Sequence, residues 1–210
     1  VPLPKDYLKI IYKNIRKKGG VCISDEVQTG FGRLGKYFWG YEMHNVVPDI
    51  VILGKPMGNG HPIGAVIISD KISKSFEKGV EFFSSFGGNP VSCSAGLAVL
   101  DVIEEENLQN NAKNVGDYYL KQLNILKKEF SCIGDIRGTG LFLGIEIVKN
   151  NSKKPNTVLA QKLKKELRKK FILVGSDGPY NNVIKTKPPI CFTKENVDTV
   201  CQEIKNILNK

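Results

Sequence analysis

Two short apolar runs that stop abruptly at charged residues constrain this chain more than any other feature. The run 21–23 ends shortly before Asp25, and the run 50–53 ends two residues before Lys55. A third apolar run, 64–69, is equally continuous. Uninterrupted strands of this kind are typical of a mostly parallel sheet that is covered on both faces. Ligands bind in the crevice outside the carboxyl ends of such strands, so we expect Asp25 and Lys55 at a ligand-binding edge.

Helical patterns surround these strands and change in character near residue 108. Before that point, a helical stripe covers 6–16, and Asn89 with Pro90 begins a helix that we expect to reach residue 106. Beyond it we expect a connecting helix, 108–130, and then short strands and two amphipathic helices, the last one capped by Thr193. The expected strands are 141–148, 171–174 and 183–186. The chain therefore divides into two predicted domains, 1–108 and 109–210.

Composition excludes several classes of function. The net charge is +10, but the lysines alternate with apolar residues on predicted helical faces, so we expect no nucleic-acid partner. No apolar run approaches the ~18 residues of a membrane span. The five cysteines form no C-x-x-C pair, which argues against a disulfide framework or a metal site and favours a reducing compartment. Because the chain begins at Val1 rather than Met, we interpret it as a fragment.

Opposite charges at one rim of a sheet have two interpretations. They are either solvent-facing loop charges or parts of a site for pyridoxal 5'-phosphate (PLP). PLP catalysis needs a lysine amine that forms a Schiff base, an acid that keeps the ring nitrogen protonated, and donors around the phosphate. Lys55 and Asp25 supply the first two groups, but their spacing alone leaves both interpretations open.

Longer motifs favour the second interpretation. The segments 22–33, 48–50 and 54–60 closely resemble the signature of class III aminotransferases, and 86–90 and 137–141 also recur in that family. The resemblance implies an α/β protein with the type I fold of PLP enzymes. Residues 1–108 would be the C-terminal part of the large domain, with its mixed, mostly parallel sheet, and 109–210 the small α+β domain. It also implies a homodimer or homotetramer with sites shared between subunits.

The same resemblance assigns roles to individual residues. Lys55 would form the Schiff base and act as the base on the substrate, and Asp25 would pair with the ring nitrogen. Val27 would pack on one ring face, and Gln28 would reach the side of the ring hydroxyl. Ser85 stands where the family usually has a threonine that binds the cofactor phosphate of the neighbouring subunit, and it keeps the hydroxyl. The family's upstream glycine-serine loop has no counterpart in these residues.

One departure from the family pattern suggests the substrate class. Amino-acid transaminases generally carry an arginine before a Pro-Pro pair, and here that residue is Lys185. The segment resembles phospho-lyases that act on ethanolamine phosphate or 5-phosphohydroxylysine. Arg33, Lys185 and Lys187 are candidates for binding the leaving phosphate, although each is equally consistent with a solvated loop cation.

Two alternatives remain open at this stage: an ω-aminotransferase that passes an amino group to glyoxylate or pyruvate, and a truncated, non-catalytic fragment. The resemblance implies a mitochondrial protein whose targeting segment would lie upstream of Val1. A cytoplasmic location is the alternative.

Overall fold

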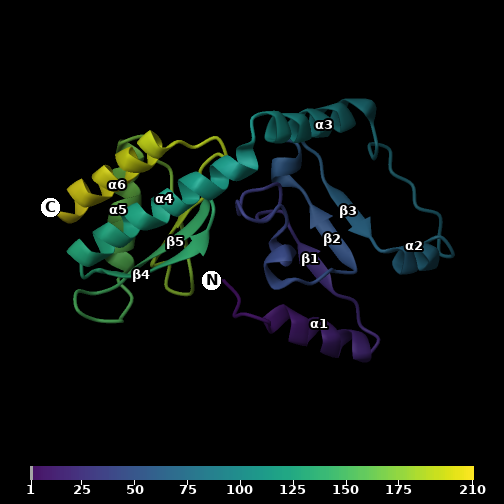
Figure 1. The fold of residues 1–210 in the computed structure, drawn as a ribbon, viewed down its shortest axis with the longest axis horizontal. Coiled ribbons are helices and arrows are strands. Elements are labelled where there is room, and N and C mark those ends of the chain that lie inside the picture. The colour runs from purple at the N-terminus through teal and green to yellow at the C-terminus, as the bar shows by residue number, and fades with distance from the viewer. Residues whose placement is uncertain (1) are drawn as a thin grey trace. The chain divides into compact units, whose positions relative to one another are not determined.

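The computed structural model describes residues 2–210 and contains two compact units (Figure 1). The N-terminal unit consists of residues 3–32 and 37–109, and the C-terminal unit of Pro2, 33–36 and 110–210. Val1, from which we interpreted the chain as a fragment, lies outside the described residues. The predicted domain boundary near residue 108 stays a prediction, although the chain leaves the N-terminal unit close to it, after Gln109.

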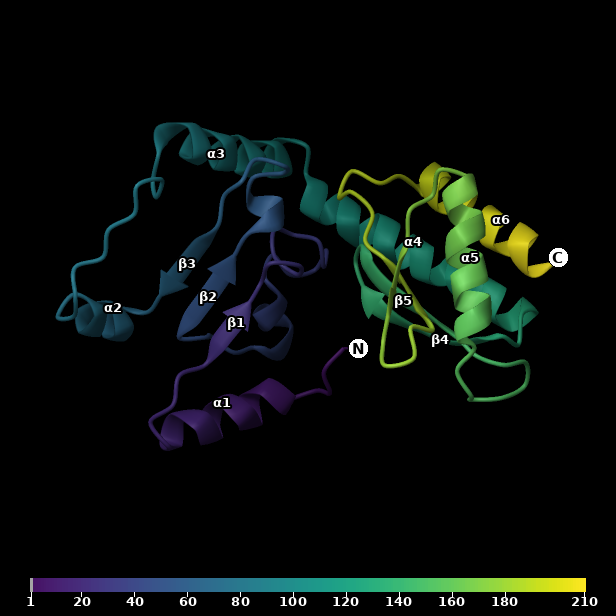
Figure 2. The same cartoon turned by 180° about the vertical axis from the view of Figure 1, so that it is seen from behind.

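A three-stranded sheet organises the N-terminal unit. Figure 2 shows its middle strand, β2, between β1 and β3. The pair β1–β2 is parallel and the pair β2–β3 is antiparallel, so this part of the sheet is mixed. The elements are α1 (Tyr7–Lys17), β1 (Ile23–Asp25), the 3₁₀ helix η1 (Gly40–His44), β2 (Ile50–Leu53), the 3₁₀ helix η2 (Lys55–Met57), β3 (Ala65–Ile68), α2 (Asp70–Phe76) and α3 (Pro90–Glu105).

Asp49 joins the start of β2 to the end of α1 and to the start of β1 by hydrogen bonds. Its carboxylate accepts hydrogen bonds from the backbone N–H of Cys22 (2.9 Å) and from Nε of Arg16 (3.1 Å). Burial favours the neutral carboxyl group, but these two donors outweigh that effect and lower the pKa of Asp49. The ionised side chain therefore joins the end of α1 to the two parallel strands at neutral pH.

The three strands are less buried than their continuous apolar runs predict. Ile23, Val66 and Ile67 are each more than half exposed. The described residues place few side chains over these positions, and coverage of the strands on both faces stays a prediction. Leu53, at the end of β2, is the buried exception.

The C-terminal unit is an antiparallel sheet packed against helices. Its strand order is β4-β5-β7-β6, and alternate residues of β5 are buried. The buried side chains of the sheet, of α4, of α5 and of α6 form one hydrophobic core, and α5 and α6 lie side by side (Figures 1 and 2). The elements are α4 (Leu108–Glu129), β4 (Ile133–Thr139), β5 (Phe142–Ile147), α5 (Thr157–Lys169), β6 (Gly175–Asp177), β7 (Val183–Thr186) and α6 (Lys194–Leu208).

The strand predictions in this unit were wrong for 171–174 and omitted β4 and β6. The sequence of β4 contains two glycines and two charged residues, so it lacks an apolar signal, and its pairing with β5 makes it a strand. The apolar segment 171–174 is no strand. It closes the end of α5, where the N–H of Ile172 donates to the carbonyl of Leu167 and Phe171 adopts a φ of 60°.

Two buried helical glycines should respond in opposite directions to an added methyl group. A Cβ at Gly116, in α4, would lie 2.4 Å from the carbonyl oxygen of Gly140, whereas a Cβ at Gly96, in α3, would meet only ordinary contacts from 3.6 Å outward. Alanine in a helix interior is intrinsically favoured over glycine by about 1 kcal/mol. We expect Gly96→Ala to leave stability unchanged or raised, and Gly116→Ala to lower it by about 1–3 kcal/mol through overpacking.

Denaturant unfolding of both variants measures this difference. Equal stability of Gly116→Ala and the unmodified chain would contradict the close approach of α4 to the β4–β5 turn.

Candidate active site

Lys55 occupies a strained position at the end of β2. It begins η2, its side chain is exposed, and its φ of 35° lies in the left-handed region. Such a backbone costs of order 1–3 kcal/mol for a residue other than glycine, and residues of this kind cluster at functional sites. The turn is closed by the N–H of Met57, which donates to the carbonyl of Gly54 (3.0 Å). The fold thus holds a lysine where a relaxed turn would have glycine.

Asp25 is the last residue of β1 and lies at the same edge. It is opposite Ile52 in the parallel register, so both strands end at this edge. Its Oδ1 accepts a hydrogen bond from the N–H of Val27 (3.0 Å). A Cβ built at Gly54 would lie 3.6 Å from Cγ2 of Val27, so this apolar side chain is beside the residue that precedes Lys55. The structure therefore places Asp25, Val27 and Lys55 at the ends of two neighbouring strands.

Gln28 and Ser85 are less closely tied to this edge. Gln28 follows Val27 and is exposed. Ser85 lies in the exposed loop before α3, and no hydrogen bond of the described residues joins it to Asp25 or Lys55. The structure therefore places Gln28 at the edge and leaves Ser85 in a separate loop.

Glu26, the other acid at this strand end, is not a solvent-facing charge. Its side chain is 1% exposed and lies within the loop that follows β1. No role was predicted for Glu26 from the sequence. The available signal was the series of small or hydroxyl-bearing residues around it, Ser24, Thr29 and Gly40, which can bring donors close to a carboxylate.

The turn after Lys55 rests on α3. Nε2 of His61 is 2.8 Å from Oγ of Ser92, and Asn89 caps the helix by accepting a hydrogen bond from the N–H of Ser92 (2.9 Å). Nδ2 of Asn89 also donates to Oγ of Ser92 and to the carbonyl of Phe86 (2.8 Å). Asn89 thus connects the loop that contains Ser85 with the helix that supports the Lys55 turn.

The C-terminal unit contains the three predicted phosphate-binding cations. Nη1 of Arg33 donates to the carbonyls of Pro188 (2.7 Å) and Leu141 (3.3 Å), so Arg33 lies against the segment that carries Lys187. Burial lowers the pKa of the Arg33 guanidinium, and no ion pair of the described residues includes it. Nζ of Lys187 lies over the ring of Phe142, 5.7 Å from its centroid.

Lys185, by contrast, has an acidic partner. Its Nζ is 2.6 Å from Oδ2 of Asp177 on the neighbouring strand. This hydrogen bond, together with that from the N–H of Gly178 and the lysine's charge, lowers the pKa of Asp177. At neutral pH any anion bound by Lys185 therefore shares it with a carboxylate.

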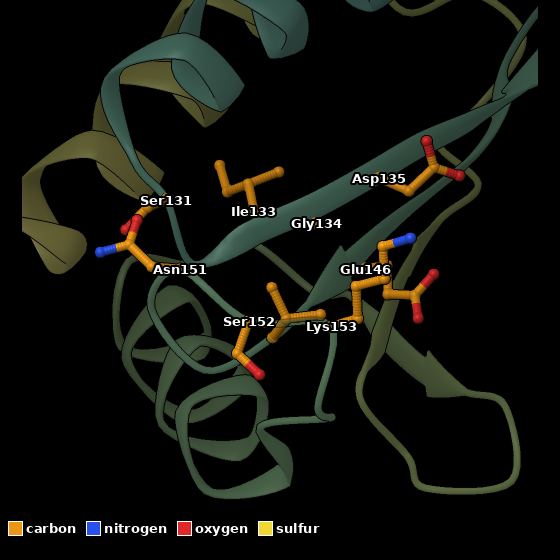
Figure 3. Close-up of a pocket in the computed structure, with 9 residues that line it drawn as sticks. Ser131, Ile133, Gly134, Asp135, Glu146, Asn151, Ser152 and Lys153 are labelled. Atoms are coloured by element: carbon orange, nitrogen blue, oxygen red, sulfur yellow. The ribbon is translucent and has the colours of Figure 1, made fainter.

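A hollow of about 570 Å³ lies elsewhere in the C-terminal unit (Figure 3). It lies along β4, the end of β5 and the loop 151–153, with Asp135 and Glu146 at one end. Arg137 pairs with both carboxylates and Lys127 with Asp135, so both carboxylates already have cationic partners. No predicted site residue lines this hollow.

Residues 2–210 contain no group of three or more His, Cys, Asp or Glu side chains that could hold a metal ion. In residues 2–210, no helix is both long enough and apolar enough to cross a membrane.

The family model for class-III aminotransferases matches residues 1–208. The chain belongs to this family. A fruit fly (Drosophila melanogaster) relative, alanine–glyoxylate aminotransferase 2-like, is 51% identical over 198 residues, which cover 93% of this chain and 40% of that protein. Human mitochondrial alanine–glyoxylate aminotransferase 2 is 43% identical over 213 residues, which cover 100% of this chain and 41% of that protein.

A solved structure is also closely similar. It is a phospholyase from Arthrobacter in complex with phosphoethanolamine, with a TM-score of 0.97 and 41% identity, and the match covers 100% of this chain and 50% of that chain. The expected α/β fold of type I PLP enzymes is confirmed. Class-III aminotransferases and their phospholyase relatives are enzymes that use PLP. The chain spans about half the length of these proteins or less.

Two substitutions of Asn89 test how this residue joins α3 to the loop that contains Ser85. We expect Asn89→Ala to lower stability by about 0.5–2 kcal/mol, because it removes the acceptor for the Ser92 N–H and both donors of the side chain. Asn89→Asp keeps the acceptor but loses the donors, so its effect should be smaller. Denaturant unfolding of the three proteins measures the order, and an aspartate variant less stable than the alanine variant would contradict it.

Proposed function

We propose that this chain is the cofactor-binding and small-domain part of a PLP-dependent phospho-lyase. The enzyme would eliminate phosphate from a vicinal amino-phosphate, ethanolamine phosphate or 5-phosphohydroxylysine. The observation that carries the proposal is the 41% identity and 0.97 TM-score, over the whole chain, to a phospholyase in complex with phosphoethanolamine. Lys185, at the position where transaminases generally have arginine, supports it independently.

The residues at the β1–β2 edge fit the cofactor. Lys55 would link to it covalently, Asp25 would pair with its ring nitrogen, Val27 would pack on its ring and Gln28 would lie near its hydroxyl. Bound there, PLP would supply an electron sink for the substrate carbon that carries the amino group. Ser85 would serve the phosphate of a neighbouring subunit's cofactor, which makes a homodimer or homotetramer part of the proposal.

The proposed reaction has two roles for residues of this chain, a base and a set of cations for the leaving group. Lys55 removes a proton from the carbon that bears the amino group, and the electron pair left behind expels phosphate from the adjacent carbon. Arg33, Lys185 and Lys187 hold the departing anion. The resulting enamine takes up one water, so that ethanolamine phosphate yields acetaldehyde, ammonia and phosphate.

The second candidate function is an ω-aminotransferase that uses the same Lys55 and Asp25 with glyoxylate or pyruvate. The 43% identity to a human enzyme named alanine–glyoxylate aminotransferase 2 favours it. That relative is also named mitochondrial, and we extend this location to the protein that carries this chain by resemblance alone. A third reading, a non-catalytic fragment, follows from the incomplete coverage of the relatives.

Incubation of the full-length protein with ethanolamine phosphate decides between the first two functions. We expect phosphate and ammonia in equal amounts, and a fall of at least about 100-fold in Lys55→Ala, because that variant lacks the base. Amino transfer to a 2-oxo acid without phosphate release would contradict the phospho-lyase proposal. The visible absorption of bound PLP in the 210-residue chain, lost in Lys55→Ala, would exclude the non-catalytic reading.

Lys185→Arg tests the substrate assignment. A guanidinium grips a planar carboxylate bidentately, whereas an ammonium suits a phosphate as a compact point charge. We therefore expect phosphate release to fall by about tenfold, equivalent to about 1.4 kcal/mol, relative to transfer of an amino group from alanine. Lys169→Arg, a replacement at an exposed helical ion pair, is the matched control. An unchanged ratio of the two activities would remove Lys185 from the proposed site.

A further inference from the structure

Glu26 combines deep burial with proximity to the candidate cofactor site. Its side chain is 1% exposed, while its neighbour Asp25 is exposed. Withdrawing a carboxylate from water is unfavourable unless the protein replaces the lost hydration with hydrogen bonds or an opposite charge. The contacts of Glu26 show which of the two occurs here.

Four donors converge on the Glu26 carboxylate. Oε1 accepts hydrogen bonds from Oγ of Ser24 (2.9 Å) and from the N–H of Tyr41 (3.0 Å). Oε2 accepts from Oγ1 of Thr29 (2.6 Å) and from the N–H of Gly40 (2.7 Å). Every donor is neutral, and no cation pairs with Glu26 among residues 2–210. Among these residues, hydrogen bonds alone stabilise the Glu26 carboxylate, and such bonds depend on direction.

The backbone of the same residue is also fixed on both sides. The N–H of Glu26 donates to the carbonyl of Ile52 (2.9 Å), and its own carbonyl accepts from the N–H of Gly30 (3.0 Å). Six hydrogen bonds thus join this residue to β1, to β2, to the loop directly after β1 and to the start of η1. These bonds restrict the backbone conformation of the residues immediately before and after Glu26.

Those two neighbours are Asp25 and Val27. The N–H of Val27, which belongs to the peptide unit that follows Glu26, is the donor to Oδ1 of Asp25. Rotation of the Glu26 backbone would therefore turn the Asp25 carboxylate and carry Val27 away from Gly54. The buried side chain determines where both groups point.

The loop is shaped to accept this carboxylate. A Cβ at Gly40 would lie 3.0 Å from Oε2 of Glu26 and 2.9 Å from Oγ1 of Thr29. A Cβ at Gly30 would lie 2.8 Å from the ring of Trp39. Glycine at these positions lets the loop backbone come close to Glu26 and donate hydrogen bonds to it. A loop that only packed around an apolar side chain would not need glycine there.

We propose that Glu26 is a positioning residue for the cofactor site. It holds Asp25 in the orientation that meets the ring nitrogen and Val27 against the ring, without touching the cofactor itself. This inference rests on the proposed function and adds a residue to which the family resemblance gave no role.

Glu26→Gln in the full-length protein is the principal test. The amide offers two hydrogens where the carboxylate offered acceptors, so at least one of the four donors faces another donor. Because this mismatch would displace Asp25 and Val27, we expect the affinity of the apo-protein for PLP, measured by titration, to fall by about tenfold, which does not exceed the penalty for one unsatisfied buried donor. We also expect the pH titration of the bound cofactor's visible absorption to shift, because Asp25 no longer holds the ring nitrogen in the same way.

Two further variants separate positioning from stability. Thr29→Val removes one neutral donor to Oε2 and so loosens Glu26; through the resulting displacement of Asp25 and Val27 it should reduce the affinity for PLP by about two- to fivefold, within the range of one lost hydrogen bond. Glu42→Gln alters an exposed glutamate of η1, which accepts from the N–H of Trp39, and should change neither affinity nor pH titration. If Glu26→Gln does not fold, the comparison of Thr29→Val with Glu42→Gln carries the test.

The outcomes are distinguishable. A lowered unfolding midpoint in Glu26→Gln or Thr29→Val, with unchanged affinity and pH titration of the bound cofactor, would overturn the positioning role and leave a structural one. Failure of the unmodified full-length protein to bind PLP would contradict the proposed function, and with it this inference.

Discussion

The parallel pairing of β1 with β2 is the constraint on which the candidate site depends. Because parallel strands end at the same edge, the register that sets Asp25 opposite Ile52 also brings the turn with Lys55 to that edge. No long loop is needed to bring Asp25 and Lys55 to the same edge of the sheet. The hydrogen bonds of Asp49 with Cys22 and Arg16 hold the opposite ends of the same strands, so register and site geometry are set together.

Much of this arrangement was predictable because local chemistry decided it. The run 50–53 is a strand with the predicted bounds, and Asn89 with Pro90 begins a helix as expected from the preferences of the cap and the first turn. Lys55 and Asp25 lie at strand ends for the same reason. Motif resemblance added the cofactor, which neither charge indicates by itself.

What could not be predicted depends on contacts between distant residues. The glycines and charges of β4 give no strand signal, and only its partner β5 makes that segment extended. The burial of Glu26 was not predicted, because two of its four donors, from Gly40 and Tyr41, are backbone groups whose direction depends on the folded loop. The pairing of Lys185 with Asp177 likewise depends on the register of β6 and β7.

The left-handed backbone of Lys55 implies a conflict between stability and chemistry at one position. Glycine adopts such a conformation without strain, so a chain selected for stability alone would favour glycine there. Lysine persists at an energetic disadvantage, with its long side chain exposed rather than packed. With glycine at this position the turn would be less strained, but the protein would lose the amine. The strain at Lys55 is therefore a stability cost of keeping a reactive side chain in this turn.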